Sequence, residues 1–254
     1  MKRALFALAM GAAVLGSGHA EARLDLAGIQ CTEPNLAPAE RVKYCALYAD
    51  EGSGGEAGTA GRRFLLAEAY RLAGRYADAE AILTATLNLF PKSEPFLNER
   101  AQVYAQDGKY DLALADANKA VGLAPKDDAR DKATDLNARC WVRAIAGKEL
   151  DAAIADCEAA LLLHPADPPM MDSLAFAHYR RGDLQKALDG YDAALNASPR
   201  QWPSLYMRGI VKLRAGDAGG GKDDVTTALA HAPYIGDEFA GYGVDQPNDK
   251  GELP

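Results

Sequence analysis

The sequence predicts an all-α protein built from about five consecutive helical hairpins. Two kinds of helix-ending residue recur in step along the chain. Prolines recur at Pro91, Pro125, Pro165, Pro199 and Pro233, and three of the four intervals between them are equal. This common interval, about 34 residues, is typical of helix-turn-helix solenoids. A glycine stands half an interval before each proline, with one extra residue in the third case, at Gly74, Gly108, Gly147, Gly182 and Gly216.

Each period has room for two helices. Between glycine and proline lies an amphipathic stretch such as Tyr76 to Leu89, whose apolar residues recur at helical spacing. A second helix-length stretch, such as Leu97 to Gln106, precedes the glycine. Glycine ends the first helix because it adopts a left-handed conformation at little cost, and proline ends the second because the helix cannot continue through it.

The N-terminus predicts export. Lys2 and Arg3 are followed by an apolar run from Ala4 to Leu15 and by small residues. This is the pattern of a signal peptide over residues 1–20, with cleavage after Ala20 or Ala22. The run is too short for a permanent membrane anchor, so we expect no integral membrane segment after cleavage. Alanine-rich composition suggests a bacterial source, hence a periplasmic or secreted protein.

Four cysteines permit two disulfides in three possible pairings in an oxidising compartment. Pairing of neighbours, Cys31 with Cys45 and Cys140 with Cys157, is the simplest choice, and four buried thiols are the alternative. Residues 21–50 form an N-terminal segment that carries the first pair. The glycine-rich residues 51–61 read as a flexible linker.

The expected repeat array covers residues 62–233. Its repeats span about 62–93, 94–127, 133–167, 168–201 and 202–233. Six additional residues between Pro125 and Pro165 predict a longer loop or an extended first helix. Residues 234–254 form a cap and tail, in which Tyr234, Ile235, Phe239 and Tyr242 are expected to cover the last repeat.

Small and large residues also recur at matching places within the repeats. The first repeat has Leu66, Ala67, Tyr70, Gly74, Tyr76, Ala79, Leu83 and Pro91, and the second has Ala101, Tyr104, Gly108, Tyr110, Ala113, Ala117, Ala120 and Pro125. This pattern resembles the tetratricopeptide repeat (TPR) family. The resemblance implies a solenoid that winds into a right-handed superhelix, in which each hairpin buries its apolar faces by stacking on its neighbours.

The same resemblance implies a concave groove lined mainly by the first helices. The groove positions carried over from the family are Asn98, Gln102, Asn137, Trp141, Asp172, Phe176, Tyr179, Tyr206, Ile210 and Arg214. Amides can bond to a ligand backbone, and aromatic rings offer rigid apolar contact area. The alternative is that these rings only pack between neighbouring first helices.

No residue set with matched catalytic chemistry is visible, so we expect no enzyme, no cofactor and no metal. The stretch Gly216 to Asp223 copies a phosphate-binding loop up to its last position, where Asp223 replaces the required Ser or Thr and would repel phosphate. Loss of residues 1–20 leaves 26 basic against 36 acidic residues, a net charge of −10. This acidic balance disfavours nucleic acid as a partner.

The sequence therefore predicts an exported module that binds a polypeptide partner in its groove. A structural scaffold or assembly factor of a cell-envelope or secretion complex is the alternative, with binding on the convex or terminal surfaces. An enzyme accessory domain is the third reading.

Overall fold

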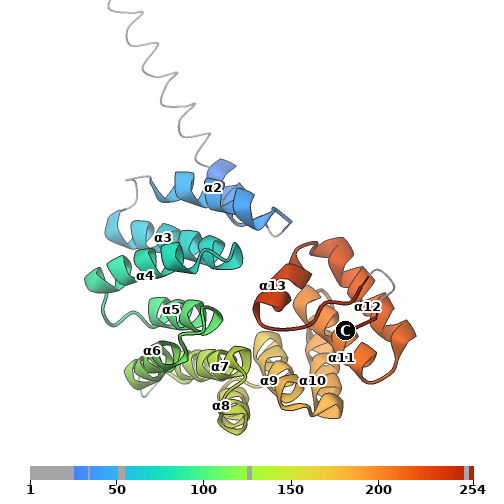
Figure 1. Ribbon diagram of the computed structural model, residues 1–254. Helices are drawn as coiled ribbons and strands as arrows, with labels where there is room; N and C mark the ends of the chain where they lie inside the picture. The colour runs from blue at the N-terminus through green and yellow to red at the C-terminus, as the bar shows by residue number, and fades with distance from the viewer. Residues whose placement is uncertain (1–25, 34, 51–54, 125–127, 249–251) are drawn as a thin grey trace, which may run out of the picture. The chain divides into compact units, whose positions relative to one another are not determined.

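The computed structural model describes residues 26–33, 35–50, 55–124, 128–248 and 252–254. All regular elements in these ranges are helices (Figure 1). The chain divides into two compact units, Met1–Ala73 and Gly74–Pro254. The expected signal peptide, residues 1–20, lies outside the described residues.

The first unit contains a short helix over residues 26–31, α2 (Pro38–Ala49) and α3 (Gly55–Leu72). Cys31 and Cys45 form the expected disulfide, which joins the short helix to α2. The linker reading of 51–61 is wrong for residues 55–61, which form the first turns of α3. Glycine has low helix propensity, so composition alone favoured a linker, but these residues are continuous with a helix that packs against α2.

The second unit is a run of helical hairpins. Its helices are α4 (Tyr76–Leu89), α5 (Glu94–Gln106), α6 (Tyr110–Leu123), α7 (Ala129–Ala146), α8 (Leu150–Leu163), α9 (Pro168–Arg181), α10 (Leu184–Ala197), α11 (Trp202–Arg214), α12 (Ala218–His231) and α13 (Ile235–Gly241). Four hairpins pair α5 with α6, α7 with α8, α9 with α10 and α11 with α12. The first helices α5, α7 and α9 also pack side by side, and α13 packs on α11 and α12. The two helices of the expected first repeat, α3 and α4, belong to different units.

The predicted helix-ending residues lie where the spacing placed them. The five turn glycines all have positive φ, between 64° and 91°. Helices α4, α8, α10 and α12 each end two residues before their proline. The third turn has one extra residue, and there Glu149 has a φ of 49° and accepts a hydrogen bond from Arg143 Nε at 3.1 Å.

The insertion in the third repeat lengthens its first helix. Helix α7 has 18 residues, and Asp128 caps its start by accepting hydrogen bonds from the backbone N–H groups of Arg130 and Asp131. The second expected disulfide, Cys140–Cys157, joins α7 to α8 inside this hairpin.

A recurring arginine joins three helices in several repeats. Arg100, Arg139 and Arg208 each donate from Nε and Nη2 to one aspartate on the second helix of their own hairpin, Asp116, Asp156 and Asp224 respectively, at 2.7–2.9 Å. Their Nη1 atoms reach the preceding second helix, at Thr84, Asn118 and Asp192. Each arginine therefore holds its own hairpin together through an ion pair and ties it to the preceding second helix through a further hydrogen bond.

The fourth repeat replaces this pair by Leu174 and Gly190. A Cβ atom on Gly190 would lie 2.8 Å from Ala175 Cβ, so α9 and α10 approach closely there. The fifth repeat has a similar close contact, because a Cβ on Gly221 would lie 2.8 Å from the carbonyl oxygen of Gly209. In the phosphate-loop-like stretch, Gly216 thus serves the turn and Gly221 serves the packing of α12 on α11.

Candidate functional site

The polar groove positions tie consecutive first helices together. Asn98 Nδ2 on α5 donates to Asp135 Oδ1 on α7 at 2.7 Å, and Ser204 on α11 donates to Asp172 on α9. All four side chains are buried. Asn98 and Asp172, which the family pattern places in the groove to meet a ligand, are thus engaged with the neighbouring repeat.

Burial changes the chemistry of these carboxyl groups. Desolvation raises the pKa of Asp172 to about 6, although the hydrogen bond from Ser204 acts in the opposite direction. Burial also raises the pKa of Asp135, and the bond from Asn98 opposes it. Asp172, whose pKa is raised in this way, lies at one wall of the cleft described below.

The apolar groove positions are covered by the C-terminal end of the chain. Phe176, Tyr206 and Ile210 are at most 1% exposed, and Tyr179 is also buried. Phe239 of α13 stacks on Tyr206, with ring centroids 5.6 Å apart. Helix α13 thus packs against α11 and α12 of the last repeat, and its Phe239 also reaches Phe176 on α9 (Figure 1).

The remaining expected positions lie around this covered surface. Arg214 Nη2 donates to Asp245 Oδ2 at 2.6 Å, and its guanidinium lies over the Tyr179 ring. Gln102 is partly buried on α5. Asn137 and Trp141, both on α7, are also partly buried and border an open cleft.

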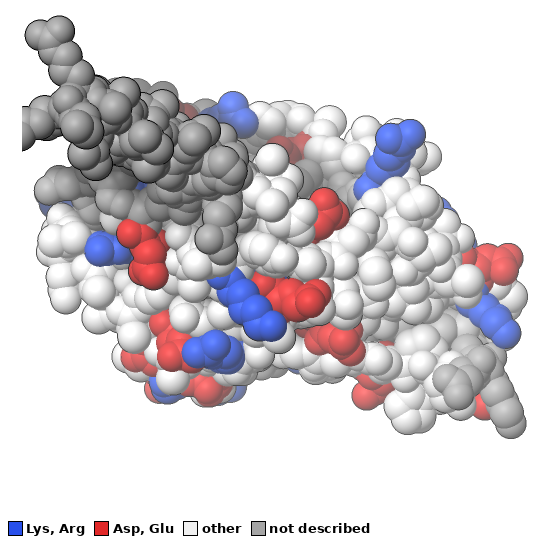
Figure 2. All heavy atoms as spheres, turned by 90° about the horizontal axis from the view of Figure 1, so that it is seen from above, with Lys and Arg blue, Asp and Glu red and all other residues white. Residues whose placement is uncertain are grey.

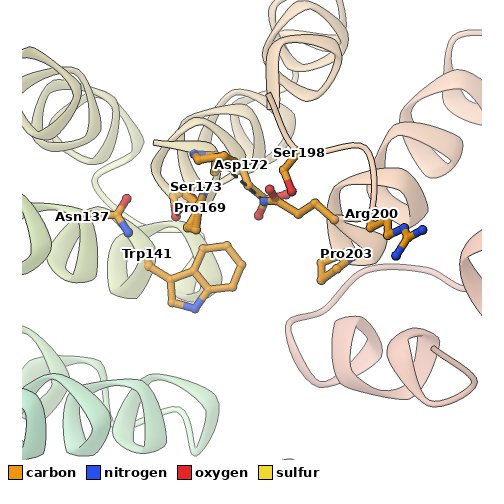
Figure 3. Close-up of a pocket in the computed structure, with 10 residues that line it drawn as sticks. Asn137, Trp141, Pro169, Asp172, Ser173, Ser198, Arg200 and Pro203 are labelled. Carbon is orange, nitrogen blue, oxygen red and sulfur yellow. Dashed lines mark hydrogen bonds between the residues drawn. The ribbon is translucent and has the colours of Figure 1, made fainter. Parts of the chain in front are cut away.

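This cleft has a volume of about 580 Å³ and lies between α7 and the starts of α9 and α11 (Figure 3). Its lining residues are Asn137, Trp141, Pro168, Pro169, Asp172, Ser173, Ser198, Arg200, Gln201 and Pro203. Figure 3 shows the Trp141 ring on one side of the cleft and Arg200 and Pro203 on the other. Gln201 Nε2 donates to the Pro168 carbonyl at 3.2 Å, which joins the two helix starts. The cleft offers an aromatic ring, three proline rings, two amides, a buried carboxyl group and one exposed cation.

Three residues of this cleft, Asn137, Trp141 and Asp172, were predicted groove positions. Pro169, Arg200 and Pro203 were not predicted from the sequence. These three lie at or just before helix starts, outside the family's groove positions. Nor was Arg180 predicted, whose Nη1 donates to the Tyr242 carbonyl at 2.6 Å. Arg180 lies one repeat length before Arg214, so the repeat register could have paired these two arginines.

The surface charge, the possible metal ligands and the hydropathy of the helices bear on the classes of partner that the site could bind. On the face drawn in Figure 2, acidic and basic side chains are interspersed, with uncharged surface between them. No group of three or more His, Cys, Asp or Glu among the described residues is placed to hold a metal ion. None of the described helices is long and apolar enough to cross a membrane.

Comparisons with known proteins agree with this architecture. A family model described as a tetratricopeptide repeat matches residues 95–127, the expected second repeat. No curated protein matches the chain in sequence. A TPR protein from Parabacteroides merdae is 17% identical, with 77% of this chain and 73% of that chain covered and a TM-score of 0.52.

A thermophilic TPR protein from Thermus thermophilus is 18% identical, with 72% of this chain and 97% of that chain covered and a TM-score of 0.59. Identities this low show a shared fold. Together with the matched repeat and the stacked hairpins, they show that the chain has the all-α solenoid fold of tetratricopeptide-repeat proteins, with one repeat over residues 95–127 that matches the family model.

Proposed function

We propose that the chain is an exported protein-interaction module that binds a segment of a partner polypeptide in the open cleft around Trp141. The observation that carries this proposal is the position of Trp141, a partly exposed ring at the wall of an open cleft. Tryptophan is enriched among the residues that dominate binding energy at protein interfaces. The other large rings of the predicted groove, Phe176, Tyr179 and Tyr206, are buried.

The cleft chemistry suits a peptide with an apolar side chain followed by a polar or acidic one. Trp141, Pro169 and Pro203 provide apolar surface, and Asn137 has an amide that can bond to a peptide backbone. Arg200 is exposed at the opposite wall, where it can pair with a carboxylate.

Export is supported by the N-terminal signal pattern and by the disulfides. Both cysteine pairs join neighbouring helices, and no free cysteine remains. Such bonds persist in oxidising compartments. The periplasm or the cell exterior is thus the proposed location of the protein and its partner.

The test is cross-linking capture of partners by the mature chain from its native envelope. Trp141→Ala and Arg200→Ala should both lose the captured partner. Lys186→Ala is the matched control, because Lys186 is an exposed cation on α10 outside the cleft. Each variant is first checked for unchanged helix content and unfolding temperature. Retention of the partner by both cleft variants would remove the binding site from this cleft.

A scaffold role is the second candidate, and exposed leucines favour it. Leu89, Leu112 and Leu162 lie on the second helices α4, α6 and α8 and are 63%, 50% and 83% exposed. A contiguous patch of such residues on the second helices would mark an assembly surface. A stoichiometric complex that Leu162→Glu dissociates, and that Trp141→Ala leaves intact, would favour this role.

A further inference from the structure

The C-terminal residues 235–245, here called the C-terminal segment, bury a regular set of apolar side chains. Ile235, Phe239, Tyr242 and Val244 are all between 2% and 7% exposed. The first three lie at positions i, i+4 and i+7, which is the spacing of one face of a helix. By contrast, Ala240 is exposed.

The partners of this face are the apolar groove residues of the first helices. Besides Tyr206, Phe239 lies 6.0 Å from the Phe176 ring on α9. Tyr242 meets Trp141 of α7 edge-on at 5.3 Å. The segment therefore contacts three successive first helices, which a cap of the last repeat alone would not do.

Two arginines hold the polar end of the segment. As described above, Arg180 donates to the Tyr242 carbonyl and Arg214 to the Asp245 carboxylate. The two arginines occupy equivalent places at the ends of α9 and α11. They form a pair of donors for a backbone carbonyl and a carboxylate that follow a short helix.

The segment depends on the groove for its order. Helix α13 has only seven residues, and a helix of this length is unstable alone in water. Amphipathic helices that bind grooves present anchors at i, i+4 and i+7 in the same way. The segment thus has the form of a groove ligand that is tethered to its receptor.

We propose that the C-terminal segment is an internal ligand of the groove, and that an external partner displaces it. The partner is a helical peptide with large apolar residues at i, i+4 and i+7 followed by a carboxylate. This inference rests on the proposed function, in which Trp141 is the anchor, and extends that site. Tyr242 of the segment contacts the Trp141 ring, and Phe176, Tyr179 and Tyr206 are buried while the segment is docked. A tethered ligand competes at a high effective concentration, so it lowers the apparent affinity for any external peptide.

The test uses the full chain and a synthetic peptide of residues 234–246 as the probe. The chain has two tryptophans, Trp141 and Trp202, so Trp202→Phe makes Trp141 the fluorescent reporter. In this background, Phe239→Ala/Tyr242→Ala should empty the groove and shift the Trp141 emission to longer wavelength. Added peptide should reverse the shift and bind at least about tenfold more tightly than to the chain with an intact segment. Ala240→Ser is the matched control and should behave like the parent chain.

A second, milder variant guards against loss of folding. Asp245→Asn removes only the carboxylate that Arg214 holds at the exposed end of the segment. We expect this full-length variant to keep the parent helix content and to bind the peptide several-fold more tightly. The peptide carrying the two alanines should bind to neither variant.

Three results would overturn the inference. One is a folded double variant, or a folded Asp245→Asn chain, that binds the peptide no better than the parent. Another is a lowered unfolding temperature in both variants without peptide binding, which would make the segment a permanent part of the core. The third is a dimer of the parent chain that the double variant dissolves, which would assign the groove to a second copy.

The two proposals fail in different ways. Peptide binding to the double variant, with no partner captured by either chain, would keep the internal ligand and remove the proposed function. Capture of one partner equally by parent and double variant would keep the proposed function and overturn displacement.

Discussion

Arg208 and Asp224 form a two-point ion pair across the last hairpin, from Nε to Oδ2 at 2.7 Å and from Nη2 to Oδ1 at 2.8 Å. The Asp224 side chain is 12% exposed and also accepts from Lys212. Asp192 accepts one bond from the same Arg208 but is 55% exposed. One arginine therefore offers a buried and an exposed partner for direct comparison.

We expect Asp224→Ala to lower the free energy of unfolding by about 2–3 kcal/mol, because it leaves two cations partly buried without their shared carboxylate. Asp192→Ala should cost less than about 1 kcal/mol, since an exposed pair is screened by water. Urea unfolding followed by circular dichroism measures both. Equal losses would contradict the structural role given to the recurring arginine.

Asp172 should make stability depend on pH. Its pKa is about 6 in the fold and 3.8 in the reference state, so between these values the native chain holds a proton that the unfolded chain has released. The free energy of unfolding should therefore fall as pH rises through this window, by up to about 3 kcal/mol.

Asp172→Asn should remove this slope and be more stable than the parent at pH 7. Urea unfolding from pH 4 to 7.5 gives the difference between the two chains. Asp189→Asn, at an exposed position on α10, controls for the loss of one charge. A parallel pH dependence in parent and Asp172→Asn chains would contradict the burial argument.

Replacing two helical glycines by alanine should change the stability of the protein in opposite directions. A Cβ on Gly221 would press on the Gly209 carbonyl oxygen and on Leu213, whereas a Cβ on Gly122 meets nothing within 4 Å. We expect Gly221→Ala to destabilise the chain by about 1–3 kcal/mol, and Gly122→Ala to stabilise it by up to about 1 kcal/mol through helix propensity. The unfolding temperatures of the two variants test this prediction. An unchanged unfolding temperature for Gly221→Ala would contradict the close packing of α11 against α12.

The two disulfides should stabilise different units. The Cys140–Cys157 bond closes a loop with a separation of 17 residues, and Cys140→Ala/Cys157→Ala should cost about 3 kcal/mol in the chain-entropy model. Cys31→Ala/Cys45→Ala should affect the first unit alone. Hydrogen exchange resolved by peptide separates these effects, and faster exchange in α7 and α8 after loss of Cys31–Cys45 would be the contrary result.

The periodic features of this protein could be read from its sequence. Helix starts and ends follow from backbone conformation: glycine accepts positive φ and proline stops a helix, so Gly182 and Pro199 mark a hairpin wherever it lies in the fold. Pairing of neighbouring cysteines was the simplest of three possible connectivities, and the structure confirms both bonds. Local rules of this kind act within a few turns of chain.

Only the tertiary structure decided what the groove residues contact. The sequence pattern around Phe176 and Tyr206 does not show what their rings contact. A partner protein, a neighbouring groove residue and the chain's own Phe239 would all provide the apolar surface that these rings need. The recurring arginines were hidden for a related reason, because Arg208 and Asp224 become neighbours only when the hairpin closes. The glycine-rich residues 55–61 form the start of α3, and α3 as a whole packs against α2, a long-range contact that local composition does not reveal. Sequence thus determined the repeating unit, and long-range packing determined which of its surfaces remain open.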